Sequence, residues 1–253
     1  MSKKYSKKQD KTKKNQLIFG IHSVIAALLN EKRIHKELIL QENINFPLER
    51  FKSRIKNIKY LDQKAFKKIY GNQQTTQGVV LITQEFLKPS FAEFLRKESK
   101  KSKSLILVLD QITDPQNIGA IMRSCALFNC SGVVVSKDNS PELTSSLIKA
   151  ASGAIEIVNY FKVINLRRIL LELKKNGYWI YGFDSSINSK SDLNFEKKSV
   201  LVFGSESKGL RDLIKKECDI LIKLKIENIS KFEIDSLNVS NAASIALYEF
   251  YKK

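Results

Sequence analysis

Histidine and cysteine are scarce in this chain, and their scarcity excludes several kinds of site. The two histidines, His22 and His35, lie near the beginning, and the three cysteines, Cys125, Cys130 and Cys218, form no C-x-x-C pair. An odd, scattered set of cysteines argues against a disulfide framework, and so few histidines argue against a zinc site. We therefore expect no metal, and no Ser-His-Asp catalysis in the C-terminal part of the chain.

Long apolar runs and common nucleotide-binding loops are also missing. No apolar run approaches the length that crosses a bilayer, and the N-terminus lacks the apolar core of a signal peptide, so we expect a cytoplasmic protein without a membrane partner. No G-x-G-x-x-G follows a strand, which removes the ordinary dinucleotide fingerprint. The segment 204–209, GSESKG, lacks the Gly-Lys-Ser/Thr ending of a phosphate loop, which argues against a nucleoside triphosphatase.

Acidic residues are far outnumbered by basic ones. The chain has 26 Asp and Glu against 44 Lys and Arg, a net charge of +18 and a pI of about 9.7. A charge this large favours a polyanionic partner and points to nucleic acid, although a lysine-rich bias that serves solubility is the alternative. The 43% of apolar residues is enough to build a folded core.

The distribution of charge and apolar residues divides the chain into four segments. Residues 1–16, rich in lysine, read as a disordered basic tail, and residues 87–103 as a charged linker. Residues 17–86 resemble a small α/β unit that carries much basic surface, which is typical of an RNA-binding module. We expect its helices and strands at 21–29, 37–40, 48–58, 65–70 and 77–82, with further helical turns at Phe91, Phe94 and Leu95 inside the linker.

Residues 104–253 have a different sequence pattern from the segments before them. Apolar runs of strand length alternate there with helical patterns. Such runs are typical of a parallel sheet that is covered by helices on both faces, so we expect an α/β fold. The strands are expected at 104–109, 132–135, 178–183, 199–203 and 219–224, and the helices at 117–129, 141–152, 163–176 and 209–217.

Three polar stretches, 110–124, 201–210 and 235–250, follow or end strands of this sheet. Because ligands bind beyond the carboxyl ends of parallel strands, the three stretches could converge on one site. The last enters a helix with Ser236 or Asn238 as its expected N-cap. Its apolar face is expected to hold Val239, Ala242, Ala243, Ala246, Leu247 and Phe250. A site of Asn, Arg, Glu, Ser and backbone amides can orient two substrates and stabilise charge.

The same three stretches resemble the signature motifs of the SpoU (TrmH-like) branch of the SPOUT RNA methyltransferases. Residues 114–124 match D-P-x-N-x-G-A-x-x-R-S, residues 204–210 match G-x-E-x-x-G-L, and residues 236–242 match S-L-N-V-S-x-A. The N-terminal unit is similar, at 19–24 and 77–79, to the ribosomal-protein-like RNA-binding domain of many members. The chain most resembles the subgroup that methylates a guanosine 2′-hydroxyl in 23S rRNA.

This resemblance implies a trefoil-knotted domain over 104–253, a homodimer, S-adenosylmethionine as cofactor, and RNA 2′-O-ribose methyltransferase activity. It implies that the cofactor contacts Gly204, Leu224, Ser236, Leu237 and Asn238. The positions that the family credits with catalysis correspond to Asn117, Arg123, Glu206, Ser236 and Asn238.

One segment departs from the family pattern. The usual Ile-Pro-Met is replaced by Leu224-Lys225-Ile226, and the following loop, 227–235, is longer than usual, which affects the expected backbone contacts to the cofactor. The role of Arg123 is also open. A guanidinium has a pKa above 12, so we expect it to bind a phosphate and stabilise a forming alkoxide rather than act as a base. The alternative is a surface charge.

Three other functions compete with methylation of 23S rRNA. The first is methylation of a guanosine 2′-hydroxyl in tRNA. The second is a non-catalytic RNA-binding protein of the same fold, against which the intact polar positions argue. The third is a generic doubly wound nucleotide-binding protein, which would fail to bind S-adenosylmethionine.

Overall fold

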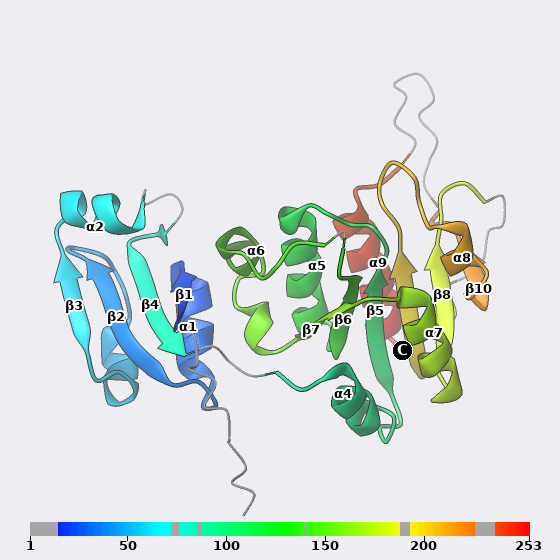
Figure 1. Ribbon diagram of the computed structural model, residues 1–253, viewed down its shortest axis with the longest axis horizontal. Coiled ribbons are helices and arrows are strands. Elements are labelled where there is room, and N and C mark those ends of the chain that lie inside the picture. The colour runs from blue at the N-terminus through cyan, green and yellow to red at the C-terminus, as the bar shows by residue number, and fades with distance from the viewer. Residues whose placement is uncertain (1–14, 72–75, 85–87, 139, 188–192, 226–235) are drawn as a thin grey trace, which may run out of the picture.

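The computed structural model describes residues 15–71, 76–84, 88–138, 140–187, 193–225 and 236–253. They form two α/β parts side by side, a small N-terminal one with four strands and a large C-terminal one with six (Figure 1). No helix within these ranges is long and apolar enough to cross a membrane.

The N-terminal part is a mixed sheet with helices on both faces. Its strand order is β1-β4-β2-β3, with bounds β1 (Asn15–Phe19), β2 (His35–Gln41), β3 (Ile58–Leu61) and β4 (Val79–Gln84). Successive residues of a strand point to opposite faces. Leu38 and Leu40 accordingly join the core beneath α1 (Ile21–Leu29) and the 3-10 helix η1 (Leu48–Arg54), whereas Ile39 packs under α2 (Gln63–Tyr70).

Two expectations for this part need correction. The basic tail expected over 1–16 ends earlier, because Asn15 and Gln16 pair with Gln84 and Thr83 in the sheet; residues 1–14 lie outside the described residues. The helix expected over 48–58 is wrong beyond Arg54. Residues 58–61 form strand β3 beside β2, because tertiary pairing overrides a helical spacing of apolar residues.

The two segments that carry the N-terminal resemblance lie in contact. The side chain of Gln77 accepts a hydrogen bond of 2.9 Å from the backbone N–H of Ile21, and Gly20 N–H donates to Thr76 O at 3.1 Å. Gly20 has a φ of 87°, a conformation that favours glycine. The patterns at 19–24 and 77–79 therefore close the start of α1 against the turn before β4.

The segment expected as a solvated linker contains a helix that belongs to the large core. Helix α4 (Phe91–Glu98) begins with a capping box between Ser90 and Glu93. Its buried Phe94 lies against Phe161 of the large sheet, with ring centroids 4.8 Å apart. The helical turns expected at Phe91, Phe94 and Leu95 are confirmed, and only the first two residues of the charged segment expected over 97–103 belong to α4.

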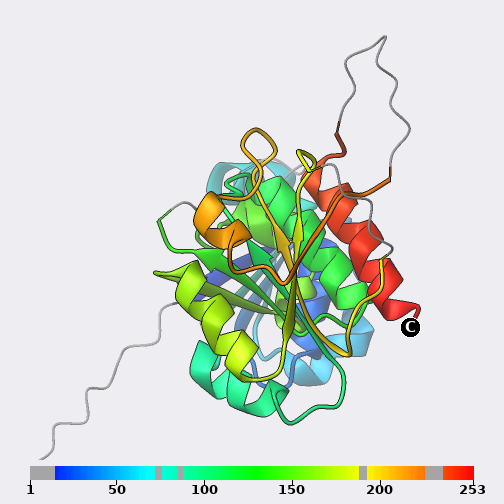
Figure 2. The same ribbon diagram turned by 90° about the vertical axis from the view of Figure 1, so that its right-hand side faces the viewer.

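The large sheet is wholly parallel, as predicted. Its order is β10 (Ile220–Ile222), β8 (Trp179–Phe183), β9 (Lys198–Phe203), β5 (Ser104–Leu109), β6 (Gly132–Ser136) and β7 (Asn159–Val163). One face packs against α5 (Pro115–Leu127), α6 (Ser145–Ala150) and α9 (Val239–Tyr251). The other packs against α4, α7 (Leu166–Lys175) and α8 (Asp212–Lys215), so helices cover both faces (Figure 2).

Some boundaries in the large part differ from expectation. Strand β7 was not predicted, because it lies at the sheet edge with Asn159, Lys162 and Val163 only half-buried, which interrupts the apolar run. The helix expected over 209–217 is reduced to α8, because residues 205–209 fold into a tight turn closed by a bridge between Ser205 and Gly209.

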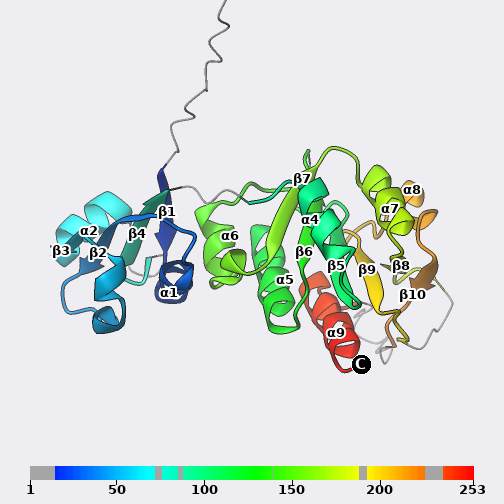
Figure 3. The same ribbon diagram turned by 90° about the horizontal axis from the view of Figure 1, so that it is seen from below.

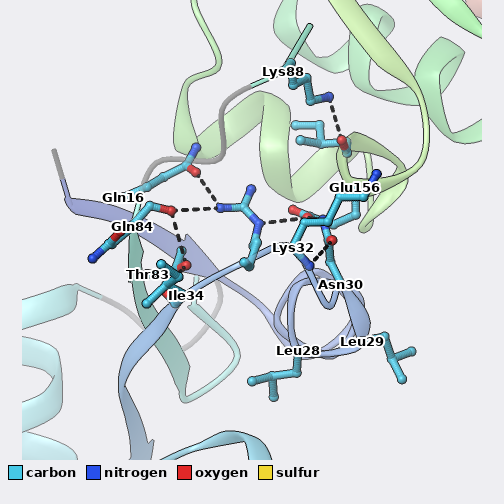
Figure 4. Close-up of polar contacts among 12 residues, drawn as sticks. Gln16, Leu28, Leu29, Asn30, Lys32, Ile34, Thr83, Gln84, Lys88 and Glu156 are labelled. Atoms are coloured by element: carbon cyan, nitrogen blue, oxygen red, sulfur yellow. Dashed lines mark hydrogen bonds and ion pairs between the residues drawn. The ribbon is translucent and has the colours of Figure 1, made fainter. Parts of the chain in front are cut away.

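The two parts are joined through a polar interface that we call the interdomain seam, formed by Asn30, Arg33, Lys88 and Glu156. Figure 4 labels Asn30, Lys88 and Glu156 in this interface. Arg33 Nε and Asn30 Nδ2 each donate to Glu156 at 2.7 Å, and the Arg33 and Glu156 side chains are 2% and 7% exposed. Lys88 Nζ donates to two backbone carbonyls near the 3-10 helix η2 (Ala154–Glu156), at 2.6 and 2.8 Å. Burial lowers the pKa of Lys88 to about 8.

The apolar side of this contact is formed by α1. Helix α1 lies beside α6 in the view from below (Figure 3). The hydroxyl of Ser23 donates to Ile148 O at 3.3 Å, and a Cβ at Gly153 would lie 2.5 Å from the Cβ of Ala26. The two backbones therefore approach closely, and the N-terminal sheet has a defined position against α6 and η2.

Candidate active site at the carboxyl ends of the large sheet

The three polar stretches converge on one cluster, as predicted. Asn117 lies in the first turn of α5, Glu206 in the turn after β9, and Asn238 at the start of α9. Asn117 Nδ2 donates to Glu206 Oε1 at 3.2 Å, and Asn238 Nδ2 lies 3.0 Å from Asn117 Oδ1 and 2.8 Å from Glu206 Oε1. Glu206 and Asn238 are exposed and Asn117 is half-buried, so the cluster is accessible to a substrate.

Glu206 is the centre of this cluster. One of its oxygens, Oε1, accepts hydrogen bonds from both amides and from the backbone N–H of Val239 at 3.3 Å. Hydrogen bonds to a carboxylate are among the stronger ones in proteins, so these donors fix the side chain of an otherwise exposed glutamate. A single negative charge is thereby placed where the three motifs meet.

Asn238 connects the cluster to its helix. Its Oδ1 accepts from Ser240 N–H at 2.9 Å and from Ser240 Oγ at 2.6 Å, which makes Asn238 the N-cap of α9. Of the two residues predicted for this role, Asn238 is the confirmed one. With Oδ1 turned toward Ser240, Nδ2 is directed at Asn117 and Glu206.

Local sequence explains how Asn117 is positioned. Asp114 caps α5 by accepting from Gln116 N–H at 2.9 Å, and Pro115 follows at the first helical position, where its fixed φ suits a helix. Gly119 lies where α5 crosses α6, and a Cβ there would be 2.3 Å from the Cβ of Ala150. The motif glycine therefore permits the helix contact that holds the first turn of α5 in place.

The turn after β9, residues 204–209, is equally constrained. A Cβ at Gly204 would lie 2.1 Å from the carbonyl carbon of Gly209, so the two ends of the turn touch. Gly209 N–H donates to Ser205 O at 2.8 Å, and Gly209 has a φ of 64°. We call residues 204–209 the second-motif turn; it carries the exposed Glu206.

A hollow lies beside the cluster, between the ends of β8, β9 and β10 and the start of α9. Four predicted cofactor residues line it: Gly204, Leu224, Ser236 and Leu237. Its apolar wall includes the stacked rings of Phe183 and Phe203, with centroids 4.5 Å apart. Asn238 is not among the lining residues but binds Glu206, which is.

A second hollow lies on the other side of Glu206. Its lining is mostly polar and shares Ser205, Glu206 and Val239 with the first hollow. The other residues that line it are Gln111, Ile112, Thr113, Asp114, Asn117, Ser207 and Lys208. Glu206 is therefore common to an apolar and a polar hollow.

Two family profiles together match nearly the whole chain. Residues 104–248 match the SpoU rRNA Methylase family, and residues 17–89 match the RNA 2′-O ribose methyltransferase substrate binding family. This chain belongs to the SpoU rRNA methylase family. Its relatives include YacO of Bacillus subtilis, whose name assigns it to the TrmH family of tRNA/rRNA methyltransferases, with 31% identity over 96% of this chain and 97% of YacO. A protein of Staphylococcus epidermidis with the same family name is 34% identical over 94% of this chain and 95% of its own.

Solved structures of SpoU enzymes share the fold. The SpoU methyltransferase AviRb from Streptomyces viridochromogenes, crystallised with AdoMet, aligns with a TM-score of 0.74 at 17% identity and covers 94% of this chain and 89% of AviRb. An AdoMet-bound rRNA methyltransferase from Sinorhizobium meliloti gives 0.72 at 20% identity, with 94% and 87% covered. Identities this low establish the likeness of fold.

Arg123 is the predicted SpoU site residue that lies apart from the cluster. It is exposed on α5, six positions after Asn117, which is about 9 Å along a helix axis. Within the described part of the chain, no hydrogen bond or ion pair is found for Arg123. The structure therefore brings together Asn117, Glu206 and Asn238, places Ser236 in the adjacent hollow, and leaves Arg123 on the surface.

Sequence reasoning did not single out two buried carboxylates near this site: Asp184, which lines the first hollow, and Asp110, which opens the stretch 110–124. Each directly follows a strand, β5 or β8, and each is buried. The available signal was an acidic residue at the end of an apolar run. Among the described residues, no group of three or more His, Cys, Asp and Glu could hold a metal. The lengthened loop, 227–235, lies outside the described residues.

Proposed function

We propose that this protein is an S-adenosylmethionine-dependent RNA methyltransferase that transfers a methyl group to a ribose 2′-hydroxyl, that of a guanosine in 23S rRNA. The observation that carries the proposal is the position of Glu206, bound by Asn117 and Asn238 and common to two adjacent hollows. Membership of the SpoU rRNA methylase family supports it. The site provides a place for two reactants that meet at one polar cluster.

The first hollow fits the cofactor by the chemistry of its lining. Apolar side chains such as Phe183, Leu224 and Leu237 suit an adenosine ring, and Ser236 and Glu206 provide polar groups. When bound, S-adenosylmethionine supplies an activated methyl group on a cationic sulfonium. Glu206 places negative charge at this hollow, which is complementary to such a cation, whereas the charge of Asp184 is paired with Lys215.

The second hollow is our candidate for the target nucleotide. Asn117 and Glu206 line it, so a ribose there has amide and carboxylate groups within reach of its hydroxyls. Glu206 accepts a hydrogen bond from the 2′-hydroxyl, and the amides of Asn117 and Asn238 hold the glutamate in position. Orientation of this kind supplies a large part of many enzymatic rate enhancements.

We assign Arg123 to the phosphate next to the target ribose. Arg123 is exposed, and its planar guanidinium suits a bidentate contact with a phosphate. We also propose a homodimer through the outer faces of α5 and α9. Four apolar side chains are exposed there: Leu127 (69%), Ile245 (42%), Tyr248 (48%) and Tyr251 (56%). A face this apolar is unusual for a surface that stays in water.

The remaining proposals give a role to each segment of the chain. We propose residues 17–86 as the RNA substrate-binding domain and 104–253 as a methyltransferase domain with a trefoil knot, in a cytoplasmic protein. The family profiles at 17–89 and 104–248 support this division. The lysines of residues 1–16 add attraction to phosphates.

Mapping of 2′-O-methyl groups in RNA tests the function. RNA from cells with and without the gene is compared, and we expect one 23S rRNA guanosine to lose its methyl group when the gene is absent. The alternative target is tRNA, which is favoured by the printed names of the curated relatives. A lost tRNA methyl group would select that alternative. RNA binding without any lost methyl group would select a non-catalytic RNA-binding protein.

A further inference from the structure

The second-motif turn emerges between two strands that each end in a buried carboxylate. In the sheet, β9 lies between β8 and β5, and it leads into residues 204–209 and then α8. Asp110 directly follows β5 and is fully buried, and Asp184 directly follows β8 and is 6% exposed. Neither residue contacts the Asn117–Glu206–Asn238 cluster in a described hydrogen bond, so their burial needs another explanation.

Asp110 holds the residue that follows the second-motif turn. Its Oδ1 accepts from Arg211 Nε at 2.8 Å and lies 2.6 Å from Arg211 Nη2, and its Oδ2 accepts from the Arg211 backbone N–H at 3.1 Å. Both the side chain and the backbone of one residue are thereby fixed by one carboxylate. Since Arg211 is two positions after Gly209, this contact sets where the turn ends.

Asp184 holds the other end of α8. Its Oδ2 forms an ion pair of 2.6 Å with Lys215 Nζ, and its Oδ1 accepts from Ser186 N–H at 2.8 Å and from Ser186 Oγ at 2.6 Å. Burial raises the pKa of Asp184, but Lys215 and Ser186 outweigh this effect and hold it below its ordinary value. Asp184 also lies against Gly209, where a Cβ would be 3.7 Å from its carboxylate oxygens.

Packing alone does not require these two charges. Burying a carboxylate costs free energy that pairing only offsets, and apolar residues of similar volume often stabilise a core equally well. A buried ion pair instead fixes local geometry, because the partner of the buried charge must lie at one defined position. Here the partners lie at the two ends of α8, because Arg211 is its N-cap and Lys215 is its last residue, and this helix follows the turn that carries Glu206.

We propose that Asp110 and Asp184 are positioning residues of the methyl-transfer site, and that they fix the second-motif turn so that Glu206 lies between Asn117 and Asn238. We call this pair of contacts, Asp110–Arg211 and Asp184–Lys215, the two-carboxylate clamp. The inference rests on the function proposed above for the site. It adds that the geometry of both hollows depends on the two strands beside β9, and on residues that touch neither RNA base nor methyl group.

The test compares Asp110→Asn and Asp184→Asn with Glu98→Gln in the full-length protein. Glu98 is a matched control, because it is a buried carboxylate, 8% exposed, that pairs with Lys101 and binds Ser104 at the opposite end of β5. Side-chain amide NMR signals of Asn117 and Asn238 report the cluster without any ligand. Steady-state kinetics with a 23S rRNA fragment give KM for each reactant and kcat.

We expect both aspartate variants to shift the two amide signals, and to lower kcat/KM for S-adenosylmethionine by about 100-fold, the effect of a displacement of about 1 Å. KM for RNA should stay within about two-fold of wild type, and Glu98→Gln should leave the signals and kinetics unchanged. Unshifted amide signals in the aspartate variants, or equal shifts in Glu98→Gln, would overturn the clamp.

A substitute variant and a comparison with wild-type activity separate failure of the clamp from failure of the proposed function. If Asp110→Asn does not fold, Arg211→Lys replaces it, since lysine keeps the charge but loses the fork that binds both sides of the carboxylate. Amide shifts in a protein whose wild type neither binds S-adenosylmethionine nor methylates RNA would support the clamp and overturn the proposed function. Methylation by the wild type with unshifted amides would do the reverse.

Discussion

Asn238 Nδ2 lies 3.0 Å from Asn117 Oδ1, although 121 positions of sequence separate the two residues. Their amides are oriented without ambiguity. Asn238 Oδ1 accepts from Ser240, so Nδ2 must face the cluster, where Asn117 Oδ1 and Glu206 Oε1 accept from it. This contact joins the start of α5 to the start of α9, and it makes each helix sensitive to the other.

Replacement of Asn238 by alanine should affect stability and function together. The variant loses the N-cap of α9, which costs on the order of 1 kcal/mol of unfolding free energy. It also removes two donors from the cluster, so S-adenosylmethionine affinity and turnover should both fall. Calorimetry and single-turnover methylation measure the two effects. Asn241→Ala is the control, because it removes an exposed asparagine of α9 that lies outside the cluster. Unchanged cofactor affinity in Asn238→Ala would contradict the assignment.

Arg123→Ala should fail differently. Arg123 lies outside the cluster on the exposed face of α5, so cofactor affinity should stay near that of wild type. If Arg123 binds a phosphate and stabilises the forming alkoxide, the single-turnover rate should fall by about 100-fold. Arg168→Ala, which removes an exposed arginine of α7, serves as control. A near-normal rate for Arg123→Ala would reduce this arginine to a surface charge.

The unfolding free energy should fall when one charge of the interdomain seam is removed, and it should largely recover when both charges are removed. Arg33→Met leaves Glu156 buried without its ion pair, and the unfolding free energy should fall by about 3–5 kcal/mol in denaturant titrations. The double variant Arg33→Met/Glu156→Leu should recover much of the loss. Glu31→Gln, at an ion pair whose glutamate is 83% exposed, should cost less than about 1 kcal/mol. A small effect of Arg33→Met alone would mean that the seam is open in solution.

The buried Lys88 should give the protein a specific dependence on alkaline pH. Its pKa is about 8 in the folded protein, against 10.5 ordinarily, so the unfolded chain holds more protons between these values. The unfolding free energy should therefore rise through this window, by at most about 3 kcal/mol from this residue. The measurement is the difference between wild type and Lys88→Met across the window. Parallel curves would show that Lys88 is not buried as described.

RNA binding should weaken steeply with salt. Each phosphate contact contributes a slope of about 0.7–0.9 in a log–log plot of affinity against salt. Deletion of residues 1–14 removes seven lysines and should flatten this slope while the methylated nucleotide stays the same. Deletion of 72–75, which contains no basic residue, is the control. A change of the methylated nucleotide after the first deletion would show that the tail reads sequence.

The sequence predicts those elements whose residues are buried on both sides. The central strands β5 and β9 appear as continuous apolar runs, because neither of their faces meets water. The edge strand β7 is half exposed, so its sequence contains no continuous apolar run that would predict a strand. Asn117, Glu206 and Asn238 were predictable as a cluster, because their stretches follow strand ends of one parallel sheet.

Contacts between distant charges could not be predicted in this way. Asp110 and Arg211 are 101 positions apart, and Arg33 and Glu156 are 123 apart, so their pairing depends on the complete fold. The position of Arg123 depends on helix phase, which places it on the side of α5 opposite the buried Ile121, two positions earlier. The helical turns at Phe91, Phe94 and Leu95 were predictable from their apolar spacing, but the burial of Glu98 in the same helix was not, because its partner Ser104 lies in the next strand.

The interdomain seam fixes the distance between the N-terminal sheet and the candidate active site. Glu156 and the carbonyls that bind Lys88 fasten the N-terminal sheet at one end of the large sheet, while Glu206 lies at the carboxyl ends of its central strands. If the first sheet holds an RNA element and Glu206 binds the target ribose, as we propose, the distance between these two features is set by the protein. RNAs would be selected by the distance between two features of their own fold, and a helix lengthened by a few base pairs would carry the ribose out of reach.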